Sequence, residues 1–192
     1  MAAEILLLVG TRPEAIKLLP VQRALLARGA RAALLATGQH RELLQPLLAT
    51  LGLPVDEELD VLTPGQSLTA LSARLLVALE EPLRRRRPAV LVVQGDTTSV
   101  AMGALAAFHV EAGLRTGDLR NPFPEEANRR LVATLASLHC APTERARRHL
   151  LSEGVAAADV HVVGNTVVDA LLDVRARVLP RLPPDPALQP LL

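Results

Sequence analysis

The sequence has few aromatic residues and almost no cysteine. Among its 192 residues the only aromatic side chains are Phe108 and Phe123. Leu, Val and Ala must therefore build the core, and a platform on which nucleic-acid bases stack is not expected. Cys140 is the single cysteine. An intrachain disulfide is excluded, and a lone cysteine in an apolar stretch is typical of core filler in a reducing compartment.

An excess of one charge and a long apolar run are also missing. The 21 Lys and Arg residues are balanced by 20 Asp and Glu residues, for a net charge of +1. This balance gives no electrostatic case for binding nucleic acid or an anionic membrane. No run approaches the roughly 20 apolar residues that span a bilayer, and the start, MAAEILLLVG, lacks the cationic region of a signal peptide. We therefore expect a soluble, cytoplasmic protein with no membrane partner.

What the sequence does contain is an alternation of short apolar runs and helical patterns. Strands are predicted over residues 4–9, 31–37, 89–93, 109–111, 136–142 and 160–163. Helices are predicted over 13–28, 40–51, 67–87, 99–108, 144–153 and 167–178, with another beginning at Pro124. The pattern indicates an α/β domain with a doubly wound, mostly parallel sheet and right-handed crossovers.

Two places depart from this regular alternation. The helix predicted over 99–108 meets the next strand at His109 without a connecting turn, although helix-to-strand loops usually take about 2–6 residues. Either the helix ends earlier or a segment is missing there. Residues 52–65 form no clear element and are predicted to be a loop. Residues 179–192 carry five prolines, so we interpret 1–178 as one domain and 179–192 as an interdomain linker or frayed end.

Charged side chains follow several of the predicted strands. The carboxyl ends of parallel strands meet in one crevice, where the acids would be Asp96, Glu111 and either Glu125 or Glu126, near Arg12, Lys17 and the turn at 39–41. Clustered carboxylates raise one another's pKa, so that one can act as acid while another acts as base. Mg²⁺ binding is the alternative, although no paired Asp-x-Asp is present. Asp96 could instead cap a helix, in competition with Thr97 or Thr98.

Seven motifs appear in a characteristic order along the chain: GTRPEAIKLLPV, TGQHRELL, GDTTS, HVEAGLRTGDL, PFPEEANRR, APTERAR and VGNTVVDALL. Over residues 4–178 they closely resemble the N-terminal half of bacterial non-hydrolysing UDP-N-acetylglucosamine 2-epimerases. The resemblance implies one Rossmann-like half of a glycosyltransferase-B-like fold, with substrate in the cleft between two domains. It also implies a homodimer that interconverts UDP-GlcNAc and UDP-ManNAc for surface polysaccharide, without metal or nicotinamide.

The resemblance also implies a mechanism and a set of site residues. UDP leaves as a proton is removed from C2, giving 2-acetamidoglucal, and UDP then adds back with the proton on the other face. By motif, the catalytic carboxylates fall on Asp96, Glu111 and Glu125. The substrate-contacting positions fall on Arg12 and Lys17, and the region holding an activating nucleotide sugar falls on Gln39 and His40.

The chain departs from the family pattern at two places. Family members carry a short Ile-Pro-Val-containing stretch before HVEAG, whereas Phe108 here runs directly into His109. The family's second domain, which supplies most uridine and diphosphate contacts and a catalytic histidine, is not in this sequence. We therefore expect residues 1–192 alone to be inactive. A non-catalytic remnant or partner-binding module, and a hydrolysing relative that releases free ManNAc, stay open as alternatives.

Overall fold

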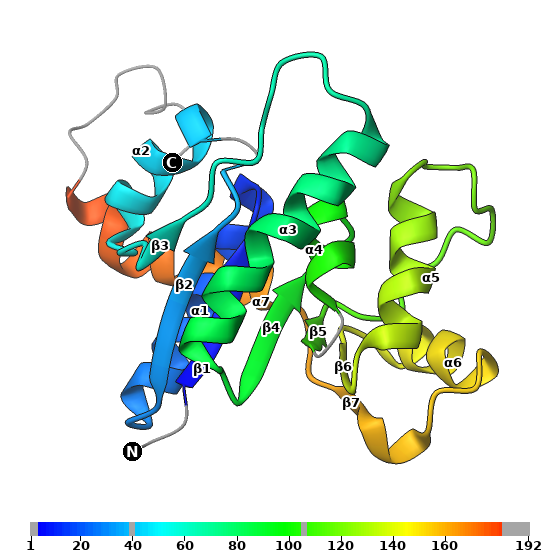
Figure 1. Cartoon of the computed structure of the whole chain (residues 1–192). Coiled ribbons are helices and arrows are strands. Elements are labelled where there is room, and N and C mark those ends of the chain that lie inside the picture. The colour runs from blue at the N-terminus through cyan, green and yellow to red at the C-terminus, as the bar shows by residue number, and fades with distance from the viewer. Residues whose placement is uncertain (1–3, 39–40, 105–106, 182–192) are drawn as a thin grey trace, which may run out of the picture.

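The computed structural model describes residues 4–38, 41–104 and 107–181. In that part of the chain seven strands form one sheet in the order β3-β2-β1-β4-β5-β6-β7, and every neighbouring pair is parallel (Figure 1). The strands are β1 (Glu4–Val9), β2 (Arg31–Ala36), β3 (Glu57–Glu58), β4 (Val90–Gln94), β5 (Ala107–Val110), β6 (Leu138–Ala141) and β7 (Val160–Val162). The strand order reverses between β1 and β4, which is where a doubly wound sheet opens a crevice at its carboxyl edge.

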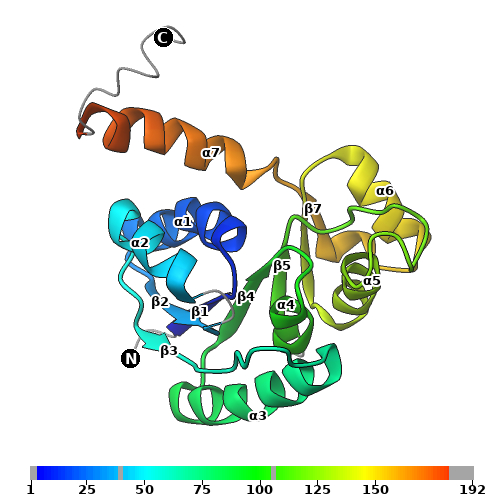
Figure 2. The same cartoon turned by 90° about the horizontal axis from the view of Figure 1, so that it is seen from above.

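Helices cover both faces of this sheet. They are α1 (Arg12–Ala27), α2 (Arg41–Leu51), α3 (Leu68–Arg86), α4 (Thr98–Gly103), α5 (Glu125–Leu135), α6 (Glu144–Ser152) and α7 (Thr166–Asp173), which continues into a π-helical turn over Val174–Val178. The view from above places α1, α2 and α7 on one face and α3 and α4 on the other (Figure 2). The predicted fold class, a doubly wound parallel α/β sheet, is confirmed.

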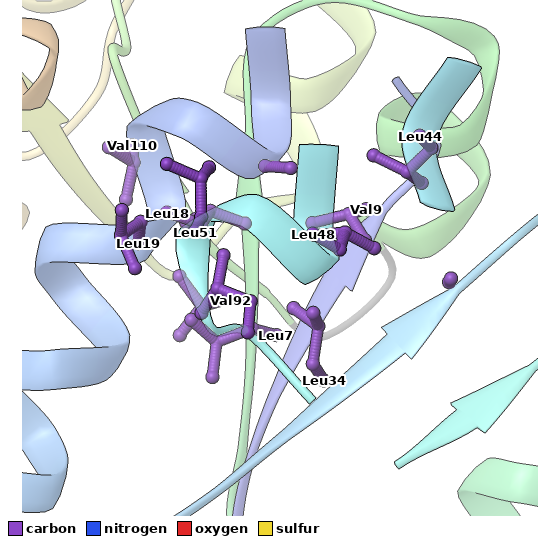
Figure 3. Close-up of a cluster of buried hydrophobic side chains, with 13 residues drawn as sticks. Leu7, Val9, Leu18, Leu19, Leu34, Leu44, Leu48, Leu51, Val92 and Val110 are labelled. Atoms are coloured by element: carbon purple, nitrogen blue, oxygen red, sulfur yellow. The ribbon is translucent and has the colours of Figure 1, made fainter. Parts of the chain in front are cut away.

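The core consists of two apolar layers, one on each face of the sheet. Leu7 and Val9 of β1 pack into the layer under α1 and α2 (Figure 3), and Leu6 and Leu8 pack into the layer under α3 and α4. The four residues from Leu6 to Val9 therefore point alternately to opposite faces and all are buried, which explains why parallel strands appear in the sequence as continuous apolar runs. Among the described residues every helix is too short or too polar to cross a membrane.

Some predicted boundaries were wrong. Helix α4 ends at Gly103 rather than at residue 108, and Phe108 lies inside β5, opposite Val92 of β4. A short apolar run fits a buried strand as well as a buried helix, so periodicity could not separate the two. No connecting turn was predicted before His109 because the helix was predicted too long. Residues 105–106 lie outside the described residues. The segment 52–65, predicted as a loop, contributes the two-residue strand β3, which pairs with the end of β2.

Candidate active site

Glu111 is the first residue after β5 and is held by three nitrogen donors. Its Oε2 accepts from Lys17 Nζ at 2.5 Å and from Gln94 Nε2 at 2.6 Å, and its Oε1 accepts from Asn165 Nδ2 at 2.8 Å. The Glu111 backbone is left-handed, with φ of 67°, a conformation that costs a non-glycine residue about 1–2 kcal/mol. Such strain marks positions that the surroundings over-determine.

The turn after Glu111 needs a glycine to bring α6 close. Gly113 has φ of +84°, and a Cβ atom there would lie 2.3 Å from the Ala146 carbonyl oxygen of α6. Ala112 keeps the chain in the sheet by donating its N–H to Cys140. The turn therefore fixes where Glu111 stands relative to the helix beside it.

Helix α1 brings Lys17 and Arg12 to the same edge of the sheet. Pro13 lies in the first turn of this helix, and Thr11 and Glu14 form a capping box at its start. Lys17 contacts Glu111, as given above. Arg12 is exposed at the first helical position and has no hydrogen-bond or ion-pair partner among the described residues. Its guanidinium group is therefore free beside the positive end of a helix dipole.

Glu14 is a buried acid that the sequence analysis did not single out. It is 2% exposed, and its Oε1 accepts from the Thr97 hydroxyl at 2.6 Å. Its other oxygen accepts the backbone N–H groups of Gly10 at 2.5 Å and Thr11 at 3.0 Å. Burial raises the pKa of the Glu14 carboxyl, against the opposing effect of these hydrogen bonds. The side chain ties the turn after β1 to the turn after β4, and the capping-box spacing was its only sequence signal.

Asp96 lies in the turn after β4 and pairs with an arginine of α5. Its Oδ2 lies 2.6 Å from Arg129 Nη2 and 2.8 Å from Arg129 Nε, and its carbonyl accepts from Asn128 Nδ2 at 2.8 Å. Burial alone would lower the pKa of Arg129, but Asp96 and Glu126 together raise it. Asp96 does not cap α4, because Thr97 accepts the N–H of Val100 in that role.

The two acids at the start of α5 have different surroundings. The Glu126 side chain is fully buried and accepts from the N–H of Thr116 at 3.1 Å and from Arg129 at 3.1 Å. Burial alone would raise the pKa of Glu126, but these donors lower it overall. Glu125 is half-buried, and its carboxylate has no partner in the described part of the chain. Of the two acids that the sequence left open, Glu126 is therefore occupied by the fold and Glu125 is free.

The structure brings Lys17, Glu111 and Asp96 of the predicted site residues into two clusters at the carboxyl ends of β4 and β5. One joins Glu111 to Lys17, Gln94 and Asn165, and the other joins Asp96 to Arg129 and Glu126. Gln94 ends β4 and Asp96 lies two residues later in the turn that follows, so the two clusters are neighbours. Among the described residues no contact joins Arg12 or Glu125 to either cluster, and Gln39 and His40 lie outside those residues.

The donor set around Glu111 bears on the Mg²⁺ alternative. Three N–H donors point at the carboxylate oxygens, which are the atoms that a hard cation would need. Within residues 4–38, 41–104 and 107–181, no group of three or more His, Cys, Asp or Glu side chains is arranged to hold a metal ion. In this structure the Glu111 oxygens are therefore occupied by hydrogen-bond donors.

Comparisons with known proteins decide the family. The family model for UDP-N-acetylglucosamine 2-epimerase matches residues 23–190. A probable UDP-N-acetylglucosamine 2-epimerase of Ralstonia nicotianae is 46% identical over 183 residues, which cover 91% of this chain and 49% of that protein. The chain belongs to the UDP-N-acetylglucosamine 2-epimerase family.

Solved structures agree with this membership. The Neisseria meningitidis UDP-GlcNAc 2-epimerase bound to UDP-GlcNAc superimposes with a TM-score of 0.87 at 38% identity, covering 92% of this chain and 50% of that one. The apo form of WaaB, an outer-core galactosyltransferase of lipopolysaccharide, has a TM-score of 0.61 at 10% identity over 84% of this chain and 45% of that one, a likeness of fold alone. The predicted glycosyltransferase-B-like half and the predicted resemblance to the N-terminal half of this family are confirmed.

The chain spans about half the length of the curated epimerase relatives it matches. Three residues of the two clusters were missed by sequence reasoning, namely Gln94, Arg129 and Asn165, and so was the buried Glu14, which contacts Thr97 beside them. Of these, Asn165 stood in the quoted VGNTVVDALL motif without a role, and Arg129 stood in PFPEEANRR. Gln94 directly precedes the GDTTS motif and lies in none of those quoted, and only the folded chain shows which carboxylate each side chain contacts.

Proposed function

We propose that this chain carries the catalytic carboxylates of a non-hydrolysing UDP-N-acetylglucosamine 2-epimerase. The observation that carries the proposal is the Lys17–Glu111 pair with two amide donors, placed at the crevice edge of a family member's sheet. The solved structures similar to this chain include an epimerase bound to UDP-GlcNAc, so the substrate proposed here is UDP-GlcNAc or UDP-ManNAc.

The proposed reaction is an elimination followed by a re-addition. A base takes the proton from C2 of the sugar, the C1–O bond breaks, and its electron pair leaves with UDP, giving 2-acetamidoglucal. UDP then adds to C1 while an acid returns a proton to the opposite face of C2. The reaction therefore needs an acid and a base on both faces of one carbon, which separate carboxylates can supply.

Three carboxylates are proposed for that work: Glu111, Asp96 and Glu125. Glu111 is fixed by its donors, whereas Glu125 is unpartnered and able to meet a ligand. Asp96 is paired with Arg129 through a charge-assisted contact. Lys17 would contact the substrate beside Glu111. Arg12 would hold the diphosphate, because the free guanidinium and the start of α1 both attract an anion.

Positioning is the reason to propose that residues 1–192 do not epimerise by themselves. Holding reactants in place can account for roughly 7–11 kcal/mol of a barrier. The chain spans about half the length of its relatives. Among its described residues we assign only one cation, Arg12, to the diphosphate. We further propose a cytoplasmic homodimer that supplies ManNAc units for surface polysaccharide, with an activating nucleotide sugar near Gln39 and His40.

Product analysis tests the proposed function. The complete gene product is incubated with UDP-GlcNAc, and the nucleotide sugars, free UDP and free ManNAc are separated and quantified. The proposal predicts UDP-ManNAc at equilibrium with UDP-GlcNAc and no accumulation of free ManNAc. Stoichiometric UDP and ManNAc would instead identify a hydrolysing relative, and no conversion would favour a non-catalytic, partner-binding module.

A further inference from the structure

The proposed function gives roles to Lys17 and Glu111 but leaves two side chains of the same cluster unused. We propose that Gln94 and Asn165 are positioning residues that hold the Glu111 carboxylate in one orientation for proton transfer. The inference rests on the proposed function. It is drawn from the contacts of these two amides, one on β4 and one at the start of α7.

Gln94 places its amide group beside Glu111. It is the last residue of β4, stands opposite Val110 in the sheet, and is 1% exposed. Its Nε2 lies 2.6 Å from Glu111 Oε2. Because an ionised carboxylate only accepts hydrogen bonds, the end of the amide that faces it must be the NH₂ group. A buried donor of this kind is destabilising when it loses its partner.

Asn165 does two things at once. Its Oδ1 accepts the N–H of Val167 at 3.1 Å and so caps α7, and its Nδ2 donates to Glu111 Oε1 at 2.8 Å. The backbone donor at one end fixes the amide orientation, so the NH₂ group must face Glu111. Asp would cap the helix about as well, but it has no proton to donate.

The other capped helices of the described chain show that a cap alone does not require asparagine. Helices α3, α4 and α6 are capped by the hydroxyls of Ser67, Thr97 and Thr143. At α7 the capping side chain carries a second, donating group, and that group is directed at a residue 54 positions away. The choice of asparagine is therefore explained by Glu111 and not by the helix.

Together the donors fix both ends of the carboxylate. Lys17 and Gln94 hold Oε2, Asn165 holds Oε1, and the left-handed backbone sets the direction in which the side chain leaves the sheet. Rotation about the last side-chain bond would break at least one of these contacts. A carboxylate that must meet one proton on one face of a sugar carbon gains rate from such fixation.

Kinetics of the complete gene product test the role. Gln94→Met keeps the volume and removes the donor, and Asn165→Asp keeps the cap and turns the donor into a repelling oxygen. Each is expected to lower kcat at least tenfold while KM changes less than about threefold. The matched control is Gln22→Met, which removes a buried amide on helix α1, away from the Glu111 contacts. This variant should leave kcat within twofold. If both variants keep kcat within twofold, the inference is wrong.

A double-mutant comparison separates positioning from general structural damage. On a Glu111→Gln background, neither Gln94→Met nor Asn165→Asp should lower residual turnover further, because residues that act through Glu111 have nothing left to position. Losses that multiply those of Glu111→Gln would show that the two amides act elsewhere and would overturn the inference.

Nitrogen-15 spectra of residues 1–192 test the contacts without any turnover. The side-chain NH₂ signals of Gln94 and Asn165 should be protected from exchange, and at least one should lose protection in Glu111→Gln, since an amide cannot accept at both ends. The NH₂ of Asn128, which donates to the Asp96 carbonyl, is the control and should not change. Unchanged Gln94 and Asn165 signals would overturn the inference. If the gene product is inactive, the proposed function fails and these spectra alone decide whether the amides hold Glu111.

Discussion

At the residue scale, the most informative contrast is between the adjacent acids Glu125 and Glu126. Both lie in the first turn of α5, where acids are common because the positive end of the helix dipole stabilises their negative charge. Only burial and contacts separate them: Glu126 is enclosed by backbone N–H groups and Arg129, whereas Glu125 faces no described partner. A sequence pattern of two consecutive acids carries no information on which one the fold uses.

The contrast predicts opposite effects for the same chemical change. Glu126→Gln leaves the Arg129 and Thr116 donors poorly matched and should destabilise the fold by roughly 1–3 kcal/mol. Glu125→Gln should change the free energy of unfolding by less than about 0.5 kcal/mol but cut turnover by roughly 10²–10⁴-fold, as expected for a positioned acid or base. Urea unfolding and initial rates on both variants are the measurements. Normal turnover by Glu125→Gln would remove that residue from the mechanism.

Arg12 is predicted to act on ligand and not on fold. The side chain is exposed and unpartnered within the described chain, so Arg12→Ala should leave the thermal midpoint nearly unchanged. Loss of a charge-assisted contact should weaken UDP-GlcNAc binding by about 1.5–3 kcal/mol, or roughly 10–150-fold. A calorimetric titration beside a thermal melt measures both. A collapsed melt with unchanged affinity in the surviving protein would make Arg12 structural instead.

At the element scale, β5 carries a buried histidine with a consequence for acid stability. His109 is 1% exposed, its Nε2 lies 2.9 Å from the Gly95 carbonyl, and it stands beside His139 of β6. Burial is the main cause that lowers the pKa of His109 to about 4; the neighbouring His139 and Arg115 act in the same direction, and the hydrogen bond to Gly95 acts against them. The folded protein therefore keeps this imidazole neutral, with Nε2 donating to the turn that carries Asp96.

The sign of the pH effect follows from which state binds the proton first. The unfolded chain takes up a proton near the ordinary value of 6.5, and the folded chain does so only near 4, so stability should fall as the pH drops through this window. His109→Gln keeps a donor for Gly95 but cannot titrate. We expect the parent protein to lose about 2–3 kcal/mol more than this variant between pH 7 and pH 4.5. Glu14 contributes with the opposite sign and cancels in the difference.

Urea unfolding of both proteins at the two pH values measures that difference. Equal losses in the parent protein and in His109→Gln would show that His109 is not kept neutral by the fold. Because Glu14 and His139 are present in both proteins, neither can imitate the predicted difference.

The elements themselves were largely predictable, and the contacts between them were not. Continuous apolar runs predicted six of the seven strands of the described residues to within a residue or two, since parallel strands are buried on both faces. The two-residue strand β3 was missed, because its segment was predicted as a loop. Helix α4 was predicted too long, because the sequence around Ala107 and Phe108 fits a helix as well as a strand. Only the pairing with β4 shows that these two residues form a strand. Glu111 could be placed at a strand end, but its partners Gln94 and Asn165 come from segments 17 and 54 residues away, a pairing set by topology.

At the scale of the whole molecule, we propose that the chain supplies one side of the site. Glu111, Asp96 and Glu125 lie in segments that follow or flank the switch point of the sheet, and relatives twice as long match it over half their length. We expect residues 1–192 alone to give no UDP-ManNAc above a no-enzyme control, even at high protein concentration, as judged by chromatography of the nucleotide sugars. Measurable conversion would show that this half holds the whole site.

Incorporation of solvent deuterium at C2 shows whether the C2 proton of the sugar is removed and replaced during the reaction. The complete gene product is incubated with UDP-GlcNAc in D₂O, and the UDP-ManNAc formed is examined by proton NMR and mass spectrometry. Removal and return of the C2 proton predicts one deuterium at C2 of UDP-ManNAc, and Glu111→Gln should slow its incorporation by at least about 10²-fold. UDP-ManNAc that retains the original C2 proton, or incorporation that is unchanged in Glu111→Gln, would contradict the account.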